Sequence, residues 1–310
     1  MCRNRFSNRR RHLIQNGGVR LTALDRRLTS AIQSPSPAAQ NHSTRMEANM
    51  SSAEFRRQRL QKWREQEFPG FDPWHFNTTV ADAVDENSVV LEIGAGSGVG
   101  LQTQMPLKSK VRHYAGVDID PRVLENPLLD EARVVDAVQL PFEDETFDIV
   151  FHTMVAEHLD DPLASVRESV RVLKPGGMLI FHTVSFWSYA SLVAAYTPHW
   201  FHTFFIRNLG MGRIDDDVFP TRYRINTRTA IHRIARACEV DVQIENVRVP
   251  PAYLAFSRIT WRCGVLFSRT FEEWFPWLRA QLVVRMSKPD ILNSQAIHSG
   301  TADDSVRRAA

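Results

Sequence analysis

The sequence has few cysteines, little net charge and no long hydrophobic run. Its three cysteines, Cys2, Cys238 and Cys263, lack the close spacing of metal ligands, so we expect neither a disulfide framework nor a metal site. This cysteine usage favours a reducing compartment. A net charge of +3 is too small to indicate nucleic-acid binding. No stretch of about 18 strongly apolar residues predicts a membrane-spanning helix, and we expect a cytoplasmic protein.

Residues 1–50 differ in composition from the rest of the chain. Residues 1–30 carry eight arginines and one acid, Asp25, and residues 31–50 show no apolar periodicity. This composition predicts a disordered basic extension. Three interpretations stay open: a transit peptide, a basic arm for an anionic surface, or an over-long gene model that truly starts at Met46 or Met50. A secretory signal is not expected, because no apolar segment follows the charges.

From Ser51 onward, short apolar segments alternate with helical patterns. The segments predict strands at 89–93, 114–118, 132–136, 147–151 and 178–181. Between the last two, Asp161 and Pro162 begin a helix that Lys174-Pro-Gly-Gly177 ends. Continuous apolar strands between helices are typical of a parallel sheet covered on both faces. The sequence therefore predicts a doubly wound α/β domain.

A glycine-rich loop follows the first strand. It reads Gly94-Ala-Gly96-Ser-Gly98-Val-Gly100, which lets the backbone turn sharply and approach a ligand. The dinucleotide fingerprint needs glycine at its sixth place, where Val99 or Leu101 stands here. A nicotinamide or flavin cofactor is therefore disfavoured. The phosphate-binding Gly-Lys-Ser/Thr pattern is also missing.

Two carboxylates follow the next strands. Asp118 ends the second strand, 20 residues after Gly98, where a carboxylate accepts hydrogen bonds from a ribose diol. Asp136 ends the expected third strand at the same sheet edge, within reach of an adenine amino group. These acids favour a nucleoside ligand at this edge.

At these residues the sequence resembles the class I S-adenosylmethionine-dependent methyltransferases, in particular the small-molecule type 11 group. Six motifs in order carry the resemblance over about residues 85–183: Leu91–Gly98, Gly116–Pro121, Asp136–Phe142, Phe147–Val150, Glu157-His158 and Leu173–Gly177. The resemblance implies S-adenosylmethionine as cofactor. It also implies a seven-stranded doubly wound sheet, mostly parallel with the last strand antiparallel, with helices on both faces.

The resemblance further implies residue roles. Glu92, Gly94, Ala95, Gly96 and Gly98 would hold the methionine part, Asp118 the ribose, Ile119 the adenine face, and Asp136 and Ala137 the adenine edge. His152 and Thr153 would border the methionine and the acceptor. His152 and His158 are the candidate catalytic bases. Asp120 and Asp148 are expected to be structural.

The family's remaining elements are expected late in the chain. A helix over 227–237 and strands over 240–247 and 252–256 would complete the domain, residues 51–257. Residues 184–225 form an insertion, and no charged residue occurs from Phe181 to Ile206. We expect a lid over an apolar acceptor, and a helical hairpin packed on the sheet is the alternative.

Residues 258–288 repeat apolar side chains at helical spacing and carry six cations. This pattern predicts an amphipathic helical tail that lies on a membrane surface, packs on its own domain or dimerises. Residues 289–310 are expected to be disordered.

These observations predict methyl transfer from S-adenosylmethionine to a small-molecule or lipid-like acceptor, with peripheral membrane contact as a further expectation. The alternative is a non-catalytic S-adenosylmethionine-binding adaptor at a membrane or partner surface. A nucleic-acid amino-methyltransferase is disfavoured, because residues 152–157 lack the Asp/Asn-Pro-Pro-aromatic signature.

Overall fold

The computed structural model describes residues 52–98, 105–189, 191–192, 220–255 and 257–290. The chain divides into two compact units, residues 1–55 and 56–310, and the second contains the sheet. The expected extension 1–50, most of the expected lid and residues 291–310 lie outside the described residues.

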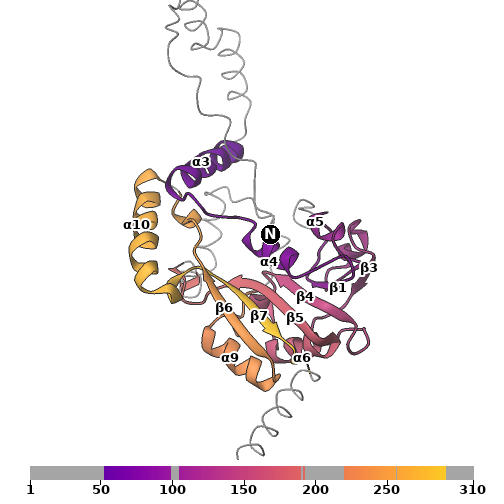
Figure 1. Cartoon of the computed structure of the whole chain (residues 1–310). Coiled ribbons are helices and arrows are strands. Elements are labelled where there is room, and N and C mark those ends of the chain that lie inside the picture. Colours follow the sequence, from indigo (N-terminus) through magenta and orange to yellow (C-terminus); the bar gives the residue numbers. More distant parts are fainter. Residues whose placement is uncertain (1–51, 99–104, 190, 193–219, 256, 291–310) are drawn as a thin grey trace, which may run out of the picture. The chain divides into compact units, whose positions relative to one another are not determined.

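A seven-stranded sheet in the order β3-β2-β1-β4-β5-β7-β6 organises the second unit (Figure 1). Its strands are β1 (Val89–Ile93), β2 (His113–Asp118), β3 (Glu131–Val134), β4 (Phe147–Thr153), β5 (Leu173–Val184), β6 (Asp241–Val247) and β7 (Gln281–Ser287). Neighbouring strands from β3 to β5 pair in parallel. β7 runs antiparallel to both β5 and β6. The predicted fold class is confirmed.

Side-chain alternation along the central strands builds one core on each face of the sheet. On one face, Leu91 and Ile93 pack with α6 (Pro162–Val172) and α9 (Arg228–Ala237). On the other face, Val90 packs with Phe76 of α4 (His75–Asp82) and Leu107 of α5 (Met105–Lys108). The parallel strands are apolar throughout because both of their faces are buried.

Three acids hold the ends of these elements. The Asp161 carboxylate caps α6 by accepting from the Ala164 amide at 3.0 Å. Asp120 caps the 3-10 helix η1 (Pro121–Glu125) by accepting from the Arg122 amide at 2.9 Å. Asp148 accepts from the Val89 amide and from Lys174 Nζ, both at 2.8 Å. The expected structural roles of Asp120 and Asp148 are confirmed.

The expected strand at 252–256 is wrong. Residues Ala252–Leu254 form the 3-10 helix η4, and the seventh strand is β7, within the segment expected to be a helical tail. The helix there, α10 (Arg258–Trp274), ends before Pro276, which disfavours helical backbone at the preceding residue, and the 3-10 helix η5 (Pro276–Leu278) follows. Leu282, Val283, Val284 and Met286 then become buried in the sheet.

Residue Glu239 ends α9 in a conformation that favours glycine. Its φ is +54°, and the Val240 and Glu239 amides donate to the Ala235 and Arg236 carbonyls at 3.1 and 3.2 Å. These two bonds define a Schellman motif, in which Val240 packs beside Ala235. A side chain in this left-handed region carries a steric cost.

Replacing Glu239 by glycine should therefore stabilise the protein. We expect Glu239→Gly to raise the free energy of unfolding by about 1 kcal/mol, or the melting temperature by about 2–4 °C. Glu239→Ala is the matched control, because it removes the carboxylate but keeps the Cβ. A lower melting temperature for Glu239→Gly than for wild type, measured by circular dichroism, would contradict the assignment.

Candidate functional site

The glycine loop leaves the end of β1 with an open backbone. Gly94, Gly96 and Gly98 have φ values of +76°, +53° and +75°. A Cβ atom at Gly94 would lie 2.4 Å from Val155 Cγ2, whereas a Cβ at Gly96 would enter open space. A ligand can therefore approach the backbone at Gly96, where any other residue would project a side chain.

Asp118 joins this loop to the end of β2. Its Oδ2 accepts from the Gly96 amide and its Oδ1 from the Asp120 amide, both at 2.9 Å. The carboxylate remains partly exposed at the sheet edge. Because two carboxylate oxygens offer about four acceptor positions, lone pairs remain for a hydroxyl pair.

The end of β3 lies beside Asp118. The Val135 amide donates to the Asp118 carbonyl at 2.9 Å, so the next residue, Asp136, follows directly at the same edge. The Asp136 side chain is exposed and Ala137 is buried, while Ile119 is exposed next to Asp118. The strand ends at Val134 rather than at 136, which leaves Asp136 in the loop above the edge.

Asn126 belongs to this site, and sequence reasoning missed it. Its buried amide donates to the Ala95 and Gly96 carbonyls at 3.2 and 3.3 Å, while its Oδ1 accepts from the Leu128 amide at 3.1 Å. Asn126 therefore holds the loop from the side. The local sequence gives no signal for this role, because the contact joins residues 30 and 31 positions apart.

Glu92 is buried near the end of β1 and receives a hydrogen bond from the Tyr114 hydroxyl. Burial, followed by the neighbouring Glu92 charge, raises the pKa of Tyr114, so the phenol stays protonated and donates. Glu92 thus connects the interior of β1 to β2. Its expected contact with the methionine part stays a prediction.

His152 lies in the core below the sheet edge. Its ring stacks on Phe181 with centroids 4.9 Å apart, and its Nδ1 has no hydrogen-bond partner among the described residues. Burial, with a smaller effect of His182, lowers the pKa of His152 to about 3. The imidazole is neutral at physiological pH, and such a group is a weak proton acceptor. Thr153, the next residue, is exposed at the end of β4.

The Glu157-His158 pair connects β5 to residues 220–226. The buried Glu157 carboxylate accepts from the Thr183 hydroxyl at 2.8 Å, and the Asn226 amide donates to Thr183 Oγ1 at 2.8 Å. The Glu157 carbonyl accepts from the Arg222 amide at 2.6 Å. His158 is partly exposed, with Nδ1 3.2 Å from the Pro220 carbonyl. A donating Nδ1–H places the lone pair on Nε2.

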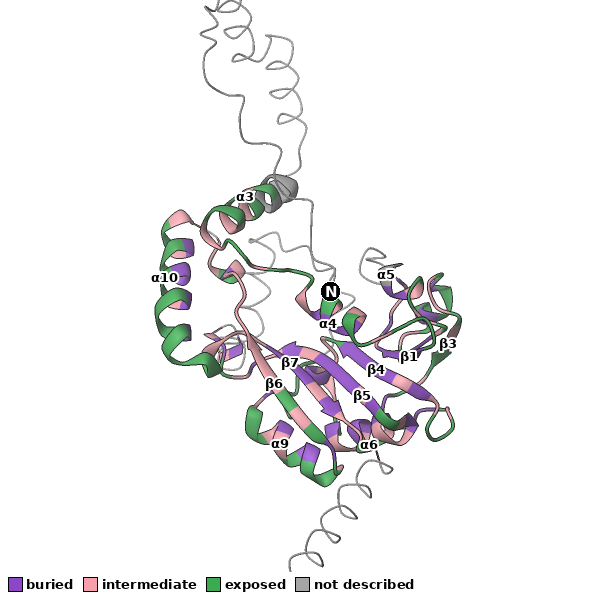
Figure 2. Cartoon of the chain, viewed as in Figure 1, coloured by how far each residue is buried: buried purple, intermediate pink, exposed green. Residues whose placement is uncertain are grey.

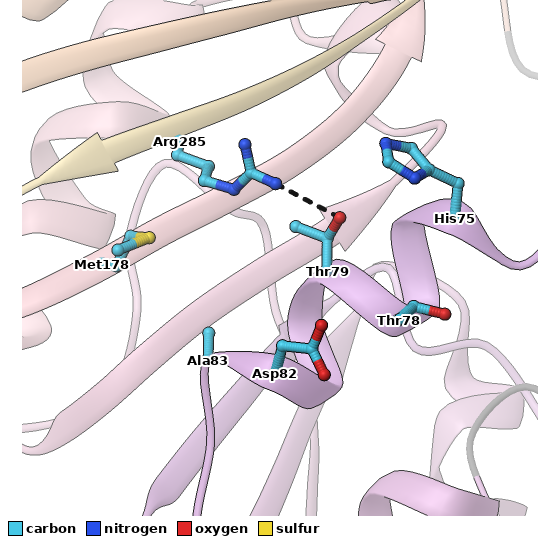
Figure 3. Close-up of a pocket in the computed structure, with 7 residues that line it drawn as sticks. All are labelled: His75, Thr78, Thr79, Asp82, Ala83, Met178 and Arg285. Carbon is cyan, nitrogen blue, oxygen red and sulfur yellow. Dashed lines mark hydrogen bonds between the residues drawn. The ribbon is translucent and has the colours of Figure 1, made fainter.

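A separate cavity of about 390 Å³ lies between α4 and the strands β5 and β7, and Figure 3 shows its lining residues. Arg285 donates to Thr79 Oγ1 at 3.3 Å across it. His75 and Arg285 also pair with the two oxygens of Glu245. Its Met178 lies opposite Ile149, several residues before the strand ends that carry the glycine loop. This cavity is therefore distinct from the edge with Asp118, and Glu245 pairs with two of the residues that line it.

The arrangement at the carboxyl ends of β1 and β2 suits a nucleoside. Open backbone at Gly96 admits an extended polar group, and Asp118 offers acceptors for ribose hydroxyls. Asp118 and Asp136 repel phosphate but accept from hydroxyl and amino groups. Parallel sheets bind ligands at this edge.

Comparison with known proteins agrees with this chemistry. Residues 91–181 match the family model described as a methyltransferase domain. A demethylmenaquinone methyltransferase of Clavibacter sepedonicus is 31% identical over 114 residues, which cover 34% of this chain and 45% of that protein. A mitochondrial ubiquinone biosynthesis O-methyltransferase of Candida albicans is 32% identical over 111 residues, which cover 33% and 34%.

The solved structure of the YcgJ protein from Bacillus has a TM-score of 0.44 and 17% identity, over 69% of this chain and 98% of that one. The matched region spans less than half the length of both curated relatives.

The matched residues begin in β1 and end in β5. They contain the glycine loop, both carboxylates at the sheet edge and all six motifs of the sequence. Residues 91–181 are therefore a class I S-adenosylmethionine-dependent methyltransferase domain of the type 11 group.

Proposed function

We propose that the chain transfers a methyl group from S-adenosylmethionine to a small-molecule acceptor of apolar, lipid-like character. The observation that carries this proposal is the joint placement of the open Gly96 backbone and the Asp118 carboxylate at one sheet edge. When bound, the cofactor supplies a methyl group on a positively charged sulfur that is a good leaving group.

The chain's own residues bind and orient. Asp118 accepts from the ribose hydroxyls while Gly96 and Asp120 fix its two oxygens. Asp136 accepts from the adenine amino group, and buried Ala137 and exposed Ile119 provide apolar surface for the base. Alignment of donor and acceptor is the main contribution of such a site and supplies about 7–11 kcal/mol of a bimolecular barrier.

Two observations support an apolar acceptor. The names of the two curated relatives point to quinone-type molecules. In addition, the 26 residues from Phe181 to Ile206 contain eight aromatic residues after Phe181 and no charged residue. Among the described part of this segment, Trp187 is exposed and packs edge-on against Trp277, with centroids 6.1 Å apart. An acceptor of this kind partitions into membranes, so the protein would meet it at a bilayer surface.

Of the two candidate bases, His158 is better suited than His152. His158 is partly exposed, and its Nδ1 contact with Pro220 orients the ring. His152 is enclosed and its pKa is about 3. We propose that His158 accepts a proton from the acceptor and that His152 packs the core.

The proposed activity is tested with methyl-labelled S-adenosylmethionine and a membrane lipid extract. We expect label in the organic phase that depends on the folded protein, and mass spectrometry then identifies the methylated acceptor. Cofactor binding without transfer to lipid extract or to aqueous metabolites would favour the adaptor alternative.

Asp118→Ala should weaken S-adenosylmethionine binding about tenfold or more, because charge-assisted bonds to the ribose are lost. Calorimetry measures the dissociation constant. Asp120→Ala is the matched control, because the Asp120 carboxylate pairs with Arg122 and caps η1. The affinity of this variant for S-adenosylmethionine should equal that of the wild type. Unchanged affinity of a folded Asp118→Ala would remove the ribose assignment. NAD should not bind.

Substitutions of the two histidines should differ in their effects on kcat and on the pH dependence of stability. His158→Gln should lower kcat without changing cofactor affinity, whereas His152→Gln should retain kcat. Because the pKa of His152 is about 3 in the folded protein and about 6.5 when unfolded, only the unfolded state gains this proton between these values. Stability is therefore lost as pH falls below about 6.5.

Urea unfolding at about pH 7 and about pH 5 measures this loss. His152→Gln should reduce the slope of the unfolding free energy against pH by up to about 1.4 kcal/mol per pH unit. His182, whose pKa burial also lowers, continues to contribute in the variant. Loss of kcat in a folded His152→Gln would reverse the assignment of the two histidines.

A further inference from the structure

Helix α10 presents a fixed side to the protein and another to solvent. Trp261 is fully buried against Trp63 of α3 (Ser52–Glu67), with ring centroids 5.9 Å apart. A Cβ at Gly264 would lie 2.7 Å from Pro251 Cβ, so the helix packs closely on the chain after β6. Near its end, Arg248 pairs with buried Glu272. These contacts fix which side chains of α10 face outward.

The outward side of α10 is mainly apolar, and its exposed acid, Glu273, pairs with Arg248. Ile259, Leu266 and Trp274 are 76%, 62% and 82% exposed, although they recur at helical spacing like core residues. Figure 2 shows α10 mainly exposed, with short buried stretches. We name the exposed residues Ile259, Cys263, Leu266, Phe271 and Trp274, together with the half-buried Phe267, the apolar strip. Phe275 and Trp277 extend it as further exposed aromatics.

Arginines flank the apolar strip on the side of α3. Arg258 and Arg262 both pair with the Glu67 carboxylate, and Arg269 donates to the Glu67 carbonyl at 2.8 Å. The Glu67 carboxylate therefore pairs with two guanidinium groups and the Glu67 carbonyl accepts from a third, while Arg262 remains 67% exposed. Arg59 and Lys62 of α3 add further positive charge. We name Arg258, Arg262 and Arg269 the arginine flank.

We propose that the apolar strip and the arginine flank dock the protein on an anionic lipid bilayer, with α10 parallel to the surface. An apolar stripe beside cations is the pattern of helices that lie in the membrane interface. Trp274 and Trp277 suit the headgroup level, where indole rings concentrate. A second copy would bring the same excess of positive charge, whereas anionic headgroups neutralise it.

Docking requires no membrane-spanning segment, and among the described residues no helix is long and apolar enough to form one. Vesicle binding by α10 does not depend on methyl transfer. Its purpose, to bring the domain to an acceptor held in the bilayer, rests on the proposed function. Vesicle binding and methyl transfer can therefore be tested, and rejected, independently of each other.

The test is flotation of the full chain, without cofactor, with vesicles of phosphatidylcholine alone or phosphatidylcholine mixed with phosphatidylglycerol. We expect flotation with the anionic vesicles only. Leu266→Gln should weaken binding about tenfold or more through lost apolar burial. Arg262→Gln should weaken it about fivefold through one lost cation at the surface.

Matched controls exist on other faces of the domain. Leu124 in η1 is 60% exposed, and Arg236 on α9 is exposed. Leu124→Gln and Arg236→Gln therefore remove an exposed leucine and an exposed arginine that do not belong to α10. Both controls should float like wild type. Circular dichroism confirms that each variant is folded, because all four side chains lie at the surface.

Three results would overturn the proposal. The first is absence of flotation with anionic vesicles. The second is unchanged flotation of Leu266→Gln, which would assign lipid binding to another segment such as the arginine-rich residues 1–50. The third is a dimer in light scattering that Leu266→Gln dissociates while vesicles bind no protein, which would make the strip an interface between copies. Loss of methyl transfer with retained flotation would reject only the proposed function.

Discussion

The hydrogen bond from the Gly96 amide to the Asp118 carboxylate connects the glycine loop to the second strand, and the site depends on it. It requires parallel β1 and β2, since only then do both loops emerge at one edge. It also requires a positive φ at Gly96, which turns the amide toward the carboxylate. Asn126 supports the loop from the other side through the Ala95 and Gly96 carbonyls. Among the described residues, the surface that we propose for the cofactor is thus held in place by the chain's own hydrogen bonds.

A second network, around the buried Glu157 carboxylate, holds backbone segments together. Glu157, Thr183 and Asn226 form a buried chain of hydrogen bonds between the turn after β4, the end of β5 and the segment before α9. A buried carboxylate is tolerated only when it is hydrogen-bonded, so these three residues hold their segments in one arrangement. His158 follows Glu157 directly, and the network thereby fixes the backbone that carries the proposed base.

Much of the fold could be predicted because the central strands are buried on both faces and therefore stand out as apolar runs. The seventh strand was not predicted, because β7 follows the amphipathic pattern of α10 after only the short 3-10 helix η5. At the site, the glycines and Asp118 are marked by local motifs. Asn126 is not, since its role depends on a contact with a loop 30 residues earlier. His152 stands at a strand end, but its side chain points into the core.

The position of β7 also affects how the chain completes its fold during synthesis. β7 is the last strand in the described part of the chain, yet it lies between β5 and β6 and provides the pairing of β6 within the sheet. Until the ribosome has released Ser287, β5 has an open edge and β6 has no place in the sheet. Open strand edges pair readily with other chains. The nascent protein therefore exposes an aggregation-prone edge until β7 has emerged.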